Sequence, residues 1–363
     1  MLTLFYSKAF PEAFPTLVFI LTSSSHTVHQ LPRFTMAQKP LSAANGEQSQ
    51  KTTVLVVGAG PVGIFLTLLL ARANIPVTLI EARDVLDKDH KAVAQSPVVF
   101  PILKHAGILE DVQAAAGELR STSSSFRRTT DKEIVAEVPK VAGRPGPLIL
   151  SQGTFSHLLM DHVKKYESAK VLMGHSLQEV DTSSPDTVTA TIKTTDGSLK
   201  TISAAYLIGA DGGRSRVRNL TGIQFEGITL PHQLIATDVF YPFDTHGFSR
   251  GANFMADPEH YGLIAPINSD GLWRVSFSVP NNMKQEEIEA VVPEKFEAMF
   301  PGPRPLNYKL DRVAPYKAQQ LCAKTFRAGR VLLIGDAAHC TFLPVTLSQS
   351  LKPSHGSNYQ GKR

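Results

Sequence analysis

The stretch Thr53-Val54-Leu55-Val56-Val57-Gly58-Ala59-Gly60-Pro61-Val62-Gly63-Ile64-Phe65-Leu66 decides how this chain folds. Its first part is a Val-rich apolar run, which indicates a strand buried on both faces. Three glycines follow at the spacing G-x-G-x-x-G, and a helical pattern then continues to about Arg72. A strand, a glycine turn and a helix in this order are typical of the first unit of a doubly wound α/β sheet.

Each glycine of the turn has a separate physical task. Gly58 permits the tight turn out of the strand, Gly60 lets a pyrophosphate approach the backbone because it has no Cβ, and Gly63 allows close packing of the helix on the strand. Free N–H groups at the helix start, aided by the helix dipole, would hold the phosphates. Pro61 costs little near the first turn, where N–H groups have no helical partner.

The residues that follow agree with this interpretation. The sequence Asn74-Ile75-Pro76 breaks the helix, the run Val77–Ile80 predicts a second strand, and Glu81 closes that strand 18 residues after Gly63. In a βαβ dinucleotide site, an acid at about this distance from the glycines meets a ribose hydroxyl. The sequence therefore predicts a dinucleotide site, and the alternative is the same unit without a ligand.

The bulk composition excludes several classes of protein. The chain has 363 residues, of which 42% are hydrophobic and 19% charged, as is typical of a globular protein with a sizeable core. Its net charge of +5 comes from scattered basic residues, so no nucleic-acid partner is expected. The two cysteines, Cys322 and Cys340, provide neither a disulfide framework nor a metal-ligand cluster. A reducing, cytoplasmic location fits this cysteine usage.

Residues 1–50 differ from the rest of the chain. The apolar run Phe14–Leu21 is too short to span a bilayer, and no firm membrane association is expected. A signal peptide and an organelle-targeting presequence are the alternatives for this segment. We expect a disordered or spurious extension, with Met36 as the natural start of the protein.

Two more acidic residues occupy the ends of apolar strands. The run Tyr206–Ala210 leads into Asp211-Gly212-Gly213, and Val331–Ile334 leads into Gly335-Asp336-Ala337-Ala338-His339. A carboxylate there can accept hydrogen bonds from ligand hydroxyls, because α/β sheets bind ligands at the carboxyl ends of their strands. The alternatives are a turn-forming role for Asp211 and a helix N-cap role for Asp336.

Taken in order from about Lys51 to His339, the three motifs resemble the FAD-dependent aromatic hydroxylases, the p-hydroxybenzoate hydroxylase-like flavoprotein monooxygenases. The resemblance implies an α/β fold in which a Rossmann-type FAD-binding domain, glutathione-reductase-like, carries an inserted β-rich substrate domain. Three β-like runs within residues 231–280 fit the insert. The expected segments are a disordered or spurious extension (1–50), the first part of the FAD-binding domain (51–230), the substrate domain (231–308), the second part of the FAD-binding domain (309–343) and a disordered tail (344–363).

The resemblance also implies roles for individual residues. Glu81 would hold the adenosine ribose, Gly335-Asp336 the ribityl chain of the flavin, and Asp211-Gly212 both FAD and the visiting nicotinamide cofactor. Gln152 lies where relatives often place an Arg or Gln near the flavin. Lys91 stands where relatives often have Arg, and it keeps the charge but loses the bidentate fork.

The reaction follows from the same resemblance. NAD(P)H reduces FAD, and one atom of O₂ enters an electron-rich aromatic small molecule, phenolic or polyketide-like, as in secondary metabolism. Tyr261 is a candidate, by location, to stabilise a phenolate. The alternatives are another FAD/NAD(P)-dependent oxidoreductase, such as a dehydrogenase, and a truncated, non-catalytic flavin-binding remnant.

The resemblance ends soon after His339. Relatives continue with a Pro, a glycine-rich turn and a long helix that embrace the flavin ring, whereas this chain continues with Cys340–Ser350 and ends at Arg363. We therefore hypothesise a truncated or mis-spliced form of a longer enzyme, with weak flavin affinity. Further back in the chain, we expect Thr154 to be the N-cap of a helix.

Overall fold

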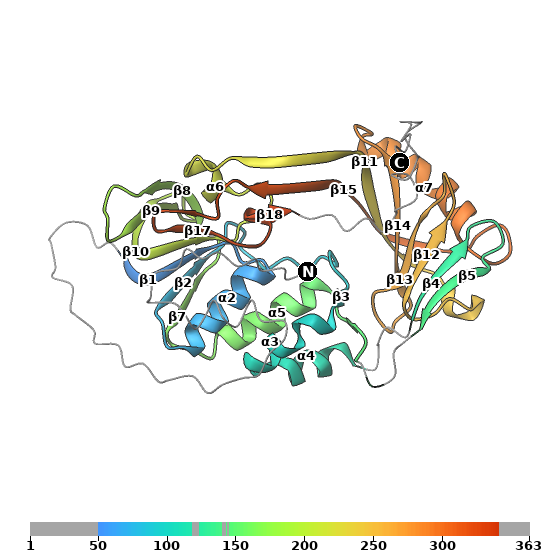
Figure 1. Cartoon of the computed structure of the whole chain (residues 1–363), viewed down its shortest axis with the longest axis horizontal. Coiled ribbons are helices and arrows are strands. Elements are labelled where there is room, and N and C mark those ends of the chain that lie inside the picture. The colour runs from blue at the N-terminus through green and yellow to red at the C-terminus, as the bar shows by residue number, and fades with distance from the viewer. Residues whose placement is uncertain (1–49, 118–122, 140–142, 144, 341–363) are drawn as a thin grey trace, which may run out of the picture.

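The computed structural model describes residues 50–117, 123–139, 143 and 145–340. These residues form two eight-stranded sheets and one two-stranded sheet. Figure 1 shows the two large sheets side by side, the first with helices beneath it and the second packed with α7. The expectations for the extension before residue 50 and for the tail 344–363 lie outside the described residues.

The first sheet is built around the apolar run that opens the glycine motif. Its strand order is β16 (Arg327–Ala328), β17 (Val331–Leu333), β10 (Leu199–Gly209), β1 (Gln50–Val57), β2 (Val77–Ile80) and β7 (Ala169–Leu172), and the antiparallel strands β8 (Ser176–Asp181) and β9 (Val188–Lys193) extend β10. Strands β17, β10, β1, β2 and β7 run parallel to one another. Every β2 residue is buried, as expected for a parallel strand covered on both faces.

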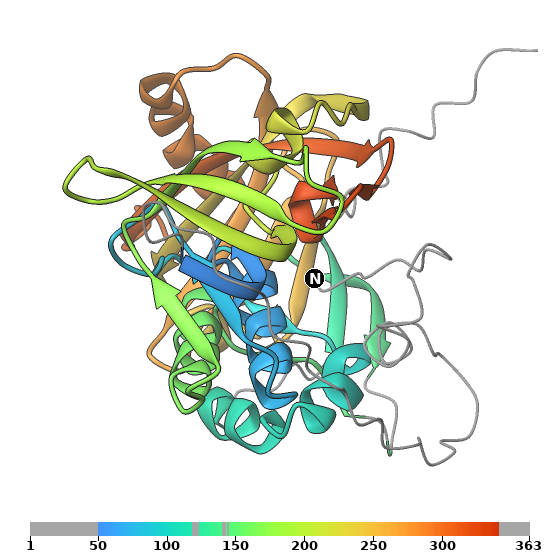
Figure 2. The same ribbon diagram turned by 90° about the vertical axis from the view of Figure 1, so that its left-hand side faces the viewer.

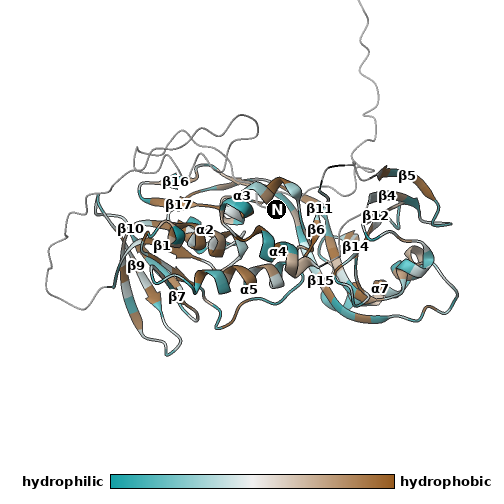
Figure 3. Ribbon diagram, turned by 90° about the horizontal axis from the view of Figure 1, so that it is seen from below, coloured by the Kyte–Doolittle hydropathy of each residue, from teal (hydrophilic) through white to brown (hydrophobic). Residues whose placement is uncertain are grey.

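Helices cover one face of the first sheet. They are α2 (Pro61–Arg72), α3 (Phe100–His105), α4 (Leu109–Ala116) and α5 (Gln152–Val163). In Figure 2 these helices lie below the strands, and Figure 3 looks onto them from below. The core on this side joins Ile64 and Leu68 of α2 to Leu159 of α5, whereas Leu55 and Val57 of β1 pack in a second cluster on the opposite face.

The order of the parallel strands locates a switch point. From β1 the chain moves outward to β2 and β7, and it later returns to place β10 and β17 on the other side of β1. The two halves of the sheet therefore part between β1 and β10. In open α/β sheets, ligands bind beyond the carboxyl ends of the strands at such a point.

The second sheet forms a separate layer in which every pair of neighbouring strands is antiparallel except β12 and β4. Its order is β18 (His339–Cys340), β15 (Lys309–Ala323), β11 (Phe225–Phe240), β14 (Leu272–Pro280), β13 (Gly262–Pro266), β12 (Ala252–Ala256), β4 (Ser123–Arg128) and β5 (Ile134–Pro139). The three predicted β-like runs are confirmed as β11, β13 and β14. Figure 1 shows that the long strands β11 and β15 span the distance between the two halves of the molecule.

Strands β4 and β5 correct the expected division of the chain. Residues 123–139 were expected to belong to the first part of the FAD-binding domain, within 51–230. Instead, β4 pairs in parallel with β12 and antiparallel with β5, so this hairpin belongs to the second sheet. The pairing places Phe126 opposite Phe254, which is far away in the sequence, and no local sequence pattern predicts it.

The remaining elements are short apart from α7, which has 15 residues. They are the two-stranded sheet of β3 (Ala94–Gln95) and β6 (Leu148–Ile149), the helices α6 (Arg216–Leu220) and α7 (Gln285–Met299), and the 3₁₀ turns η1 (Pro97–Val99), η2 (Phe243–His246) and η3 (Gly335–Ala337). Within the described part of the chain, no helix has the length and apolar character needed to cross a membrane.

Candidate functional site

Four strand ends meet at one edge of the first sheet. The last paired residues of β17, β10, β1 and β2 lie in register: Leu333 with Gly209, Gly209 with Val57, and Val57 with Ile80. Backbone hydrogen bonds continue this alignment past the strands, from Gly58 N to Ile80 O (2.8 Å), Ala210 N to Val57 O (2.8 Å) and Ile334 N to Gly209 O (2.9 Å). The glycine turn, Glu81, Asp211 and Asp336 are therefore brought to a single edge.

The three motif glycines differ in their surroundings. A Cβ on Gly63 would lie 2.0 Å from Gly58 O, so the start of α2 packs on the turn too closely for any side chain. Gly58 has φ +106°, and a Cβ there would lie 2.6 Å from Ala210 O. Around Gly60, by contrast, a Cβ would meet nothing within 4 Å. Gly60 is also the N-cap of α2, and no side chain of the described residues caps that helix, so N–H groups of its first turn are left for another partner.

Glu81 is built into the glycine turn. It is 9% exposed, and its Oε2 accepts a hydrogen bond from Ala59 N at 2.8 Å. Its Oε1 accepts from Arg83 N (3.2 Å) and Arg83 Nε (3.0 Å). Since an ionised carboxylate offers about four acceptor positions, Glu81 both fixes the turn and keeps capacity for a ligand hydroxyl.

Asp211 is engaged within its own loop. Its Oδ1 accepts a hydrogen bond from Ser215 Oγ, and its Oδ2 accepts from Arg216 N (2.7 Å) and Val217 N (3.1 Å) at the start of α6. Asp211 therefore fixes the shape of the loop after β10. These contacts agree with the alternative in which Asp211 forms the turn after its strand.

Asp336 contrasts with the other two acids. It is exposed in the 3₁₀ turn η3, and its carboxylate makes no hydrogen bond or ion pair to any residue that the structure describes. A Cβ on the neighbouring Gly335 would lie 3.2 Å from Val62 of α2, so this turn sits against the first turn of that helix. A free carboxylate thus lies beside the glycine motif.

A buried arginine ties the loops after β10 and β17 together. Arg218 is 5% exposed, and its guanidinium donates to Gly213 O (2.7 Å) and Ala337 O (2.9 Å). The same group lies 3.7 Å from the centroid of the Phe225 ring. Its burial lowers the pKa of Arg218 from the ordinary value. The second and third motifs are therefore held in fixed positions relative to each other.

Gln152 and Lys91 come from neighbouring segments. Gln152 is the first residue of α5, and its N–H donates to Ala92 O at 2.7 Å. The N-cap of α5 is Ser151, which accepts a hydrogen bond from Thr154 N at 3.2 Å, so the prediction of Thr154 as the cap was wrong. The helix begins three residues earlier than predicted, because Ser151 supplies the capping oxygen.

The Lys91 side chain is paired on the protein surface. Its Nζ lies 2.6 Å from Asp87 Oδ2, and the side chain is half exposed. Partial burial opposes ionisation of Asp87, but hydrogen bonds from Lys91, from the Asp89 N–H and from Arg83 outweigh it and hold the pKa of Asp87 well below its usual range. The cation at position 91 is therefore anchored within its own loop.

The second sheet turns one face toward this loop. On β14, Trp273, Val275 and Phe277 belong to the core that includes residues of α7. Since side chains alternate along a strand, Arg274, Ser276 and Ser278 lie on the opposite face. We call this the inner face, because Arg274 reaches the backbone of the 90–91 segment from it.

The inner face combines aromatic rings with hydroxyl groups. The Phe254 and Phe126 rings stack with their centroids 5.0 Å apart. Leu263 pairs with Phe254 on one side and with Ser276 on the other. The Ser278 hydroxyl donates a hydrogen bond to Tyr261 Oη, which places Tyr261 on the same face. A flat aromatic ligand fits such a surface.

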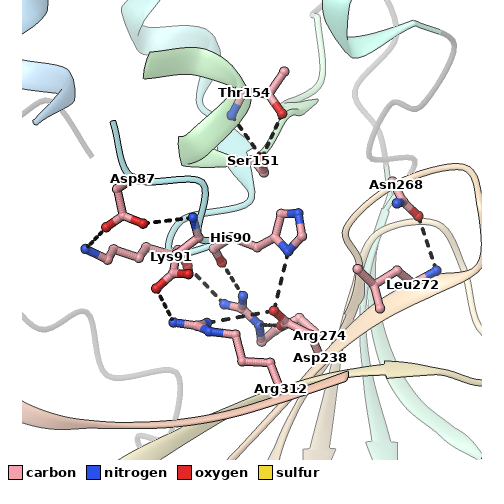
Figure 4. Close-up of polar contacts among 11 residues, drawn as sticks. Asp87, His90, Lys91, Ser151, Thr154, Asp238, Asn268, Leu272, Arg274 and Arg312 are labelled. Carbon is pink, nitrogen blue, oxygen red and sulfur yellow. Dashed lines mark hydrogen bonds and ion pairs between the residues drawn. The ribbon is translucent and has the colours of Figure 1, made fainter. Parts of the chain in front are cut away.

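The inner face also carries a charged cluster that the sequence analysis missed (Figure 4). Asp238 of β11 is 0% exposed and Arg274 of β14 is 6% exposed, with 2.6 Å between Asp238 Oδ1 and Arg274 Nε. Arg274 Nη1 donates to Lys91 O at 2.9 Å, and its Nη2 donates to His90 O. The available signal was that Asp238 is the only charged residue in Ile235–Phe240 and Arg274 the only charged residue in Leu272–Val279.

These observations suit a bound FAD. The uncapped helix start and the open space at Gly60 fit a pyrophosphate, and the exposed Asp336 carboxylate fits a hydroxylated chain. In agreement with them, a family model described as an FAD binding domain matches residues 51–346. The chain belongs to the FAD-dependent aromatic hydroxylases.

Individual relatives agree with this membership. Para-nitrophenol 4-monooxygenase from Pseudomonas sp. (strain WBC-3) is 35% identical over 294 residues, which cover 79% of this chain and 72% of that protein. The 6-hydroxy-3-succinoylpyridine 3-monooxygenase of Pseudomonas putida is 31% identical, over 81% of this chain and 74% of that one. The crystal structure of p-nitrophenol 4-monooxygenase from Pseudomonas putida DLL-E4 has a TM-score of 0.75 at 32% identity. The match covers 82% of this chain and 75% of that one.

The family membership confirms several expectations. The hydroxylase is an FAD-dependent monooxygenase, and its fold is the expected α/β unit with a β-rich second part. NAD(P)H is the usual reductant of such enzymes. The roles of Gly58, Gly60, Pro61, Gly63 and the other named residues toward FAD stay predictions.

Proposed function

We propose that this hydroxylase inserts one oxygen atom into a phenolic small molecule, with FAD at the carboxyl edge of the first sheet and the substrate on the inner face of the second. The observation that carries the proposal is the meeting of the four strand ends at one edge. When bound and reduced by NAD(P)H, FAD would activate O₂, so that one oxygen atom enters the ring and the other leaves as water. The protein binds, orients and shields the reactants.

In the proposed FAD site, each loop at this edge of the sheet would hold a different part of the cofactor. Gly60 and the first turn of α2 would hold the pyrophosphate, and Pro61 there has no N–H that needs a partner. Glu81 would accept a hydrogen bond from the adenosine ribose, and Asp336 would accept from the ribityl hydroxyls. Asp211 positions its loop, so that Gly212 and its neighbours can contact FAD and the nicotinamide cofactor through the backbone.

The flavin ring is proposed to lie toward the inner face, near Gln152. The backbone of Lys91 and Ala92 lines the approach to it, since Ala92 O accepts from Gln152 N. The Lys91 ammonium, paired with Asp87, contributes positive potential there rather than a direct contact.

Tyr261 is proposed to hold the substrate oxygen. Because Ser278 donates to Tyr261 Oη, the Tyr261 O–H proton is available to a ligand. A hydrogen bond from this proton to a phenol oxygen stabilises the phenolate, and a phenolate ring is more electron-rich and easier to hydroxylate. The stacked Phe254 and Phe126 rings would hold the substrate ring by apolar contact.

The relatives suggest where to begin with substrates. The names of two of them specify p-nitrophenol, and a neighbour in the structural comparison, a ternary complex of aklavinone-11 hydroxylase with FAD and aklavinone, has a TM-score of 0.71 at 25% identity. We propose a compact phenol as the substrate. A cytoplasmic location is proposed with it, because the nicotinamide cofactor is supplied there.

The test is a substrate screen with labelled oxygen. Protein loaded with FAD is given NADPH or NADH, ¹⁸O₂ and a panel of phenols that includes p-nitrophenol. The expected result is phenol-stimulated NAD(P)H oxidation and one ¹⁸O atom in the organic product. Substrate oxidation without ¹⁸O in any product would instead support a dehydrogenase and would refute the proposal.

A further inference from the structure

The strongest unexplained feature is the buried charge cluster on the inner face. The Asp238 side chain is fully buried, and Arg274 Nε lies 2.6 Å from its Oδ1. Its Oδ2 is buried without a hydrogen-bond partner among the described residues. His90 Nδ1 lies 3.5 Å and Arg312 Nη1 3.8 Å from Oδ2. A buried pair of this kind is costly to desolvate, so its presence points to a role beyond stability.

The contacts of Arg274 point to that role. The three nitrogens of its guanidinium are divided between the two halves of the molecule, because Nε binds Asp238 while Nη1 and Nη2 donate to the carbonyl oxygens of Lys91 and His90. Arg312 adds a parallel link at 3.0 Å to Asp89 Oδ2. Figure 4 shows these side chains converging on the loop that carries His90. The planar fork of arginine suits such divided contacts, and lysine could not reproduce them.

The loop passes this constraint on to the residues proposed to lie at the flavin. Directly after Lys91, Ala92 O accepts from Gln152 N at 2.7 Å, and Val93 O accepts from Leu150 N at 3.0 Å. Arg274 is thus hydrogen-bonded to the backbone of His90 and Lys91, and the next two residues of that segment are hydrogen-bonded to the backbone of Leu150 and Gln152. Two side chains of the loop add to this attachment, since Asp89 accepts from Arg312 and His90 Nδ1 lies 3.5 Å from Asp238 Oδ2. The Lys91 side chain takes no part in it, because it is paired with Asp87.

We propose that Arg274 and Asp238 are positioning residues of the monooxygenase, which hold the His90–Lys91 backbone against the substrate sheet and so keep the Ala92–Gln152 contact in place beside the flavin. The pair acts through the loop and touches neither cofactor nor substrate. This proposal depends on the proposed function only for the position of the flavin. The attachment of the loop to the sheet follows from the contacts of Arg274 and needs no cofactor.

Three variants test the proposal. The double variant Asp238→Leu/Arg274→Met removes both charges together, so no buried charge is left unpaired and the sheet can keep its fold. Arg274→Lys keeps the charge but cannot reach both carbonyl groups. Arg128→Met is the matched control, since Arg128 is an exposed arginine of the same sheet that pairs with Asp131 and Glu133.

Two readouts separate positioning from a purely structural role. The first is the rate of tryptic cleavage after Lys88 and Lys91 in folded protein, followed by mass spectrometry. The second is the Kd for FAD, from quenching of flavin fluorescence. We expect the double variant to be cleaved at least tenfold faster and to bind FAD about tenfold more weakly than the control, with unchanged circular dichroism, and Arg274→Lys to fall between them.

The outcomes are distinct. Equal cleavage rates and equal FAD affinities in the double variant and Arg128→Met would overturn the proposal. If the double variant does not fold, Arg274→Lys decides by the same two measurements. Absence of FAD binding by the unaltered protein would instead refute the proposed function, and the cleavage rates would still decide whether Arg274 holds the loop.

Discussion

The glycine motif gives the sharpest prediction, because two of its glycines are expected to fail in different ways. At Gly63, an added Cβ would lie 2.0 Å from Gly58 O and 3.2 Å from the Ala210 Cβ. Relief of that contact requires a shift of about 1 Å between α2 and the turn, and overpacking of this kind costs about 1–3 kcal/mol. Gly63→Ala should therefore destabilise the protein even without FAD.

At Gly60 the same substitution meets open space, and φ is −73°, which alanine adopts freely. The apoprotein of Gly60→Ala should stay within about 0.5 kcal/mol of the unaltered protein. The methyl group occupies the path of the pyrophosphate instead. Loss of one hydrogen bond to a charged group costs about 1.5–3 kcal/mol, so the Kd for FAD should rise about 10- to 100-fold.

Two measurements on each apoprotein separate these effects: urea unfolding for the free energy of unfolding, and flavin fluorescence quenching for the FAD affinity. The reasoning would be refuted by Gly60→Ala protein that binds FAD as tightly as the unaltered protein. It would equally be refuted by Gly63→Ala apoprotein of unchanged stability.

Three further predictions concern single side chains. Tyr261→Phe removes the proton offered to the substrate, so kcat/KM for a phenol should fall at least tenfold while the Kd for FAD stays constant; an unchanged kcat/KM removes Tyr261 from the site. Asp336→Asn should leave the urea midpoint unchanged, because its carboxylate has no described protein partner, but should weaken FAD binding about tenfold; a stability loss instead would mark a structural role. Burial, with a smaller contribution from the Asp336 charge, raises the pKa of Cys340 to about 11, so its alkylation by iodoacetamide should rise about tenfold per pH unit from pH 8 to pH 10. A rate that levels off near pH 9 would show that the thiol is not buried as described.

The edge of the first sheet could be predicted from sequence because its signals are local. The apolar run, the glycine turn and the acid at the strand end all lie within about 30 residues and together predict one βαβ unit. Parallel strands then place their carboxyl ends at the same edge of the sheet. Glu81, Asp211 and Asp336 were found in this way. Their different states could not be predicted, because only the three-dimensional contacts distinguish them. Asp211 accepts three hydrogen bonds from its own loop, whereas the Asp336 carboxylate has no partner among the described residues.

The inner face was harder to predict because its partners are distant in sequence. Strand β4 pairs with β12 across more than 120 residues, so Ser123–Arg128 gave no local sign of its sheet. The Asp238–Arg274 pair left only a weak signal, since each residue is the single charge in a strand segment of uncharged residues. Its link to His90 depends on the packing of a loop against a sheet, and neither periodicity nor spacing encodes that contact.

The central claim is that the turns after β1, β10 and β17 hold a single FAD molecule. Hydrogen–deuterium exchange of the protein with and without FAD tests it most directly. The account predicts that FAD protects residues 58–63, 211–213 and 335–338 together, over one titration curve with one Kd. Protection of the first segment while either of the other two exchanges at its unliganded rate would contradict it.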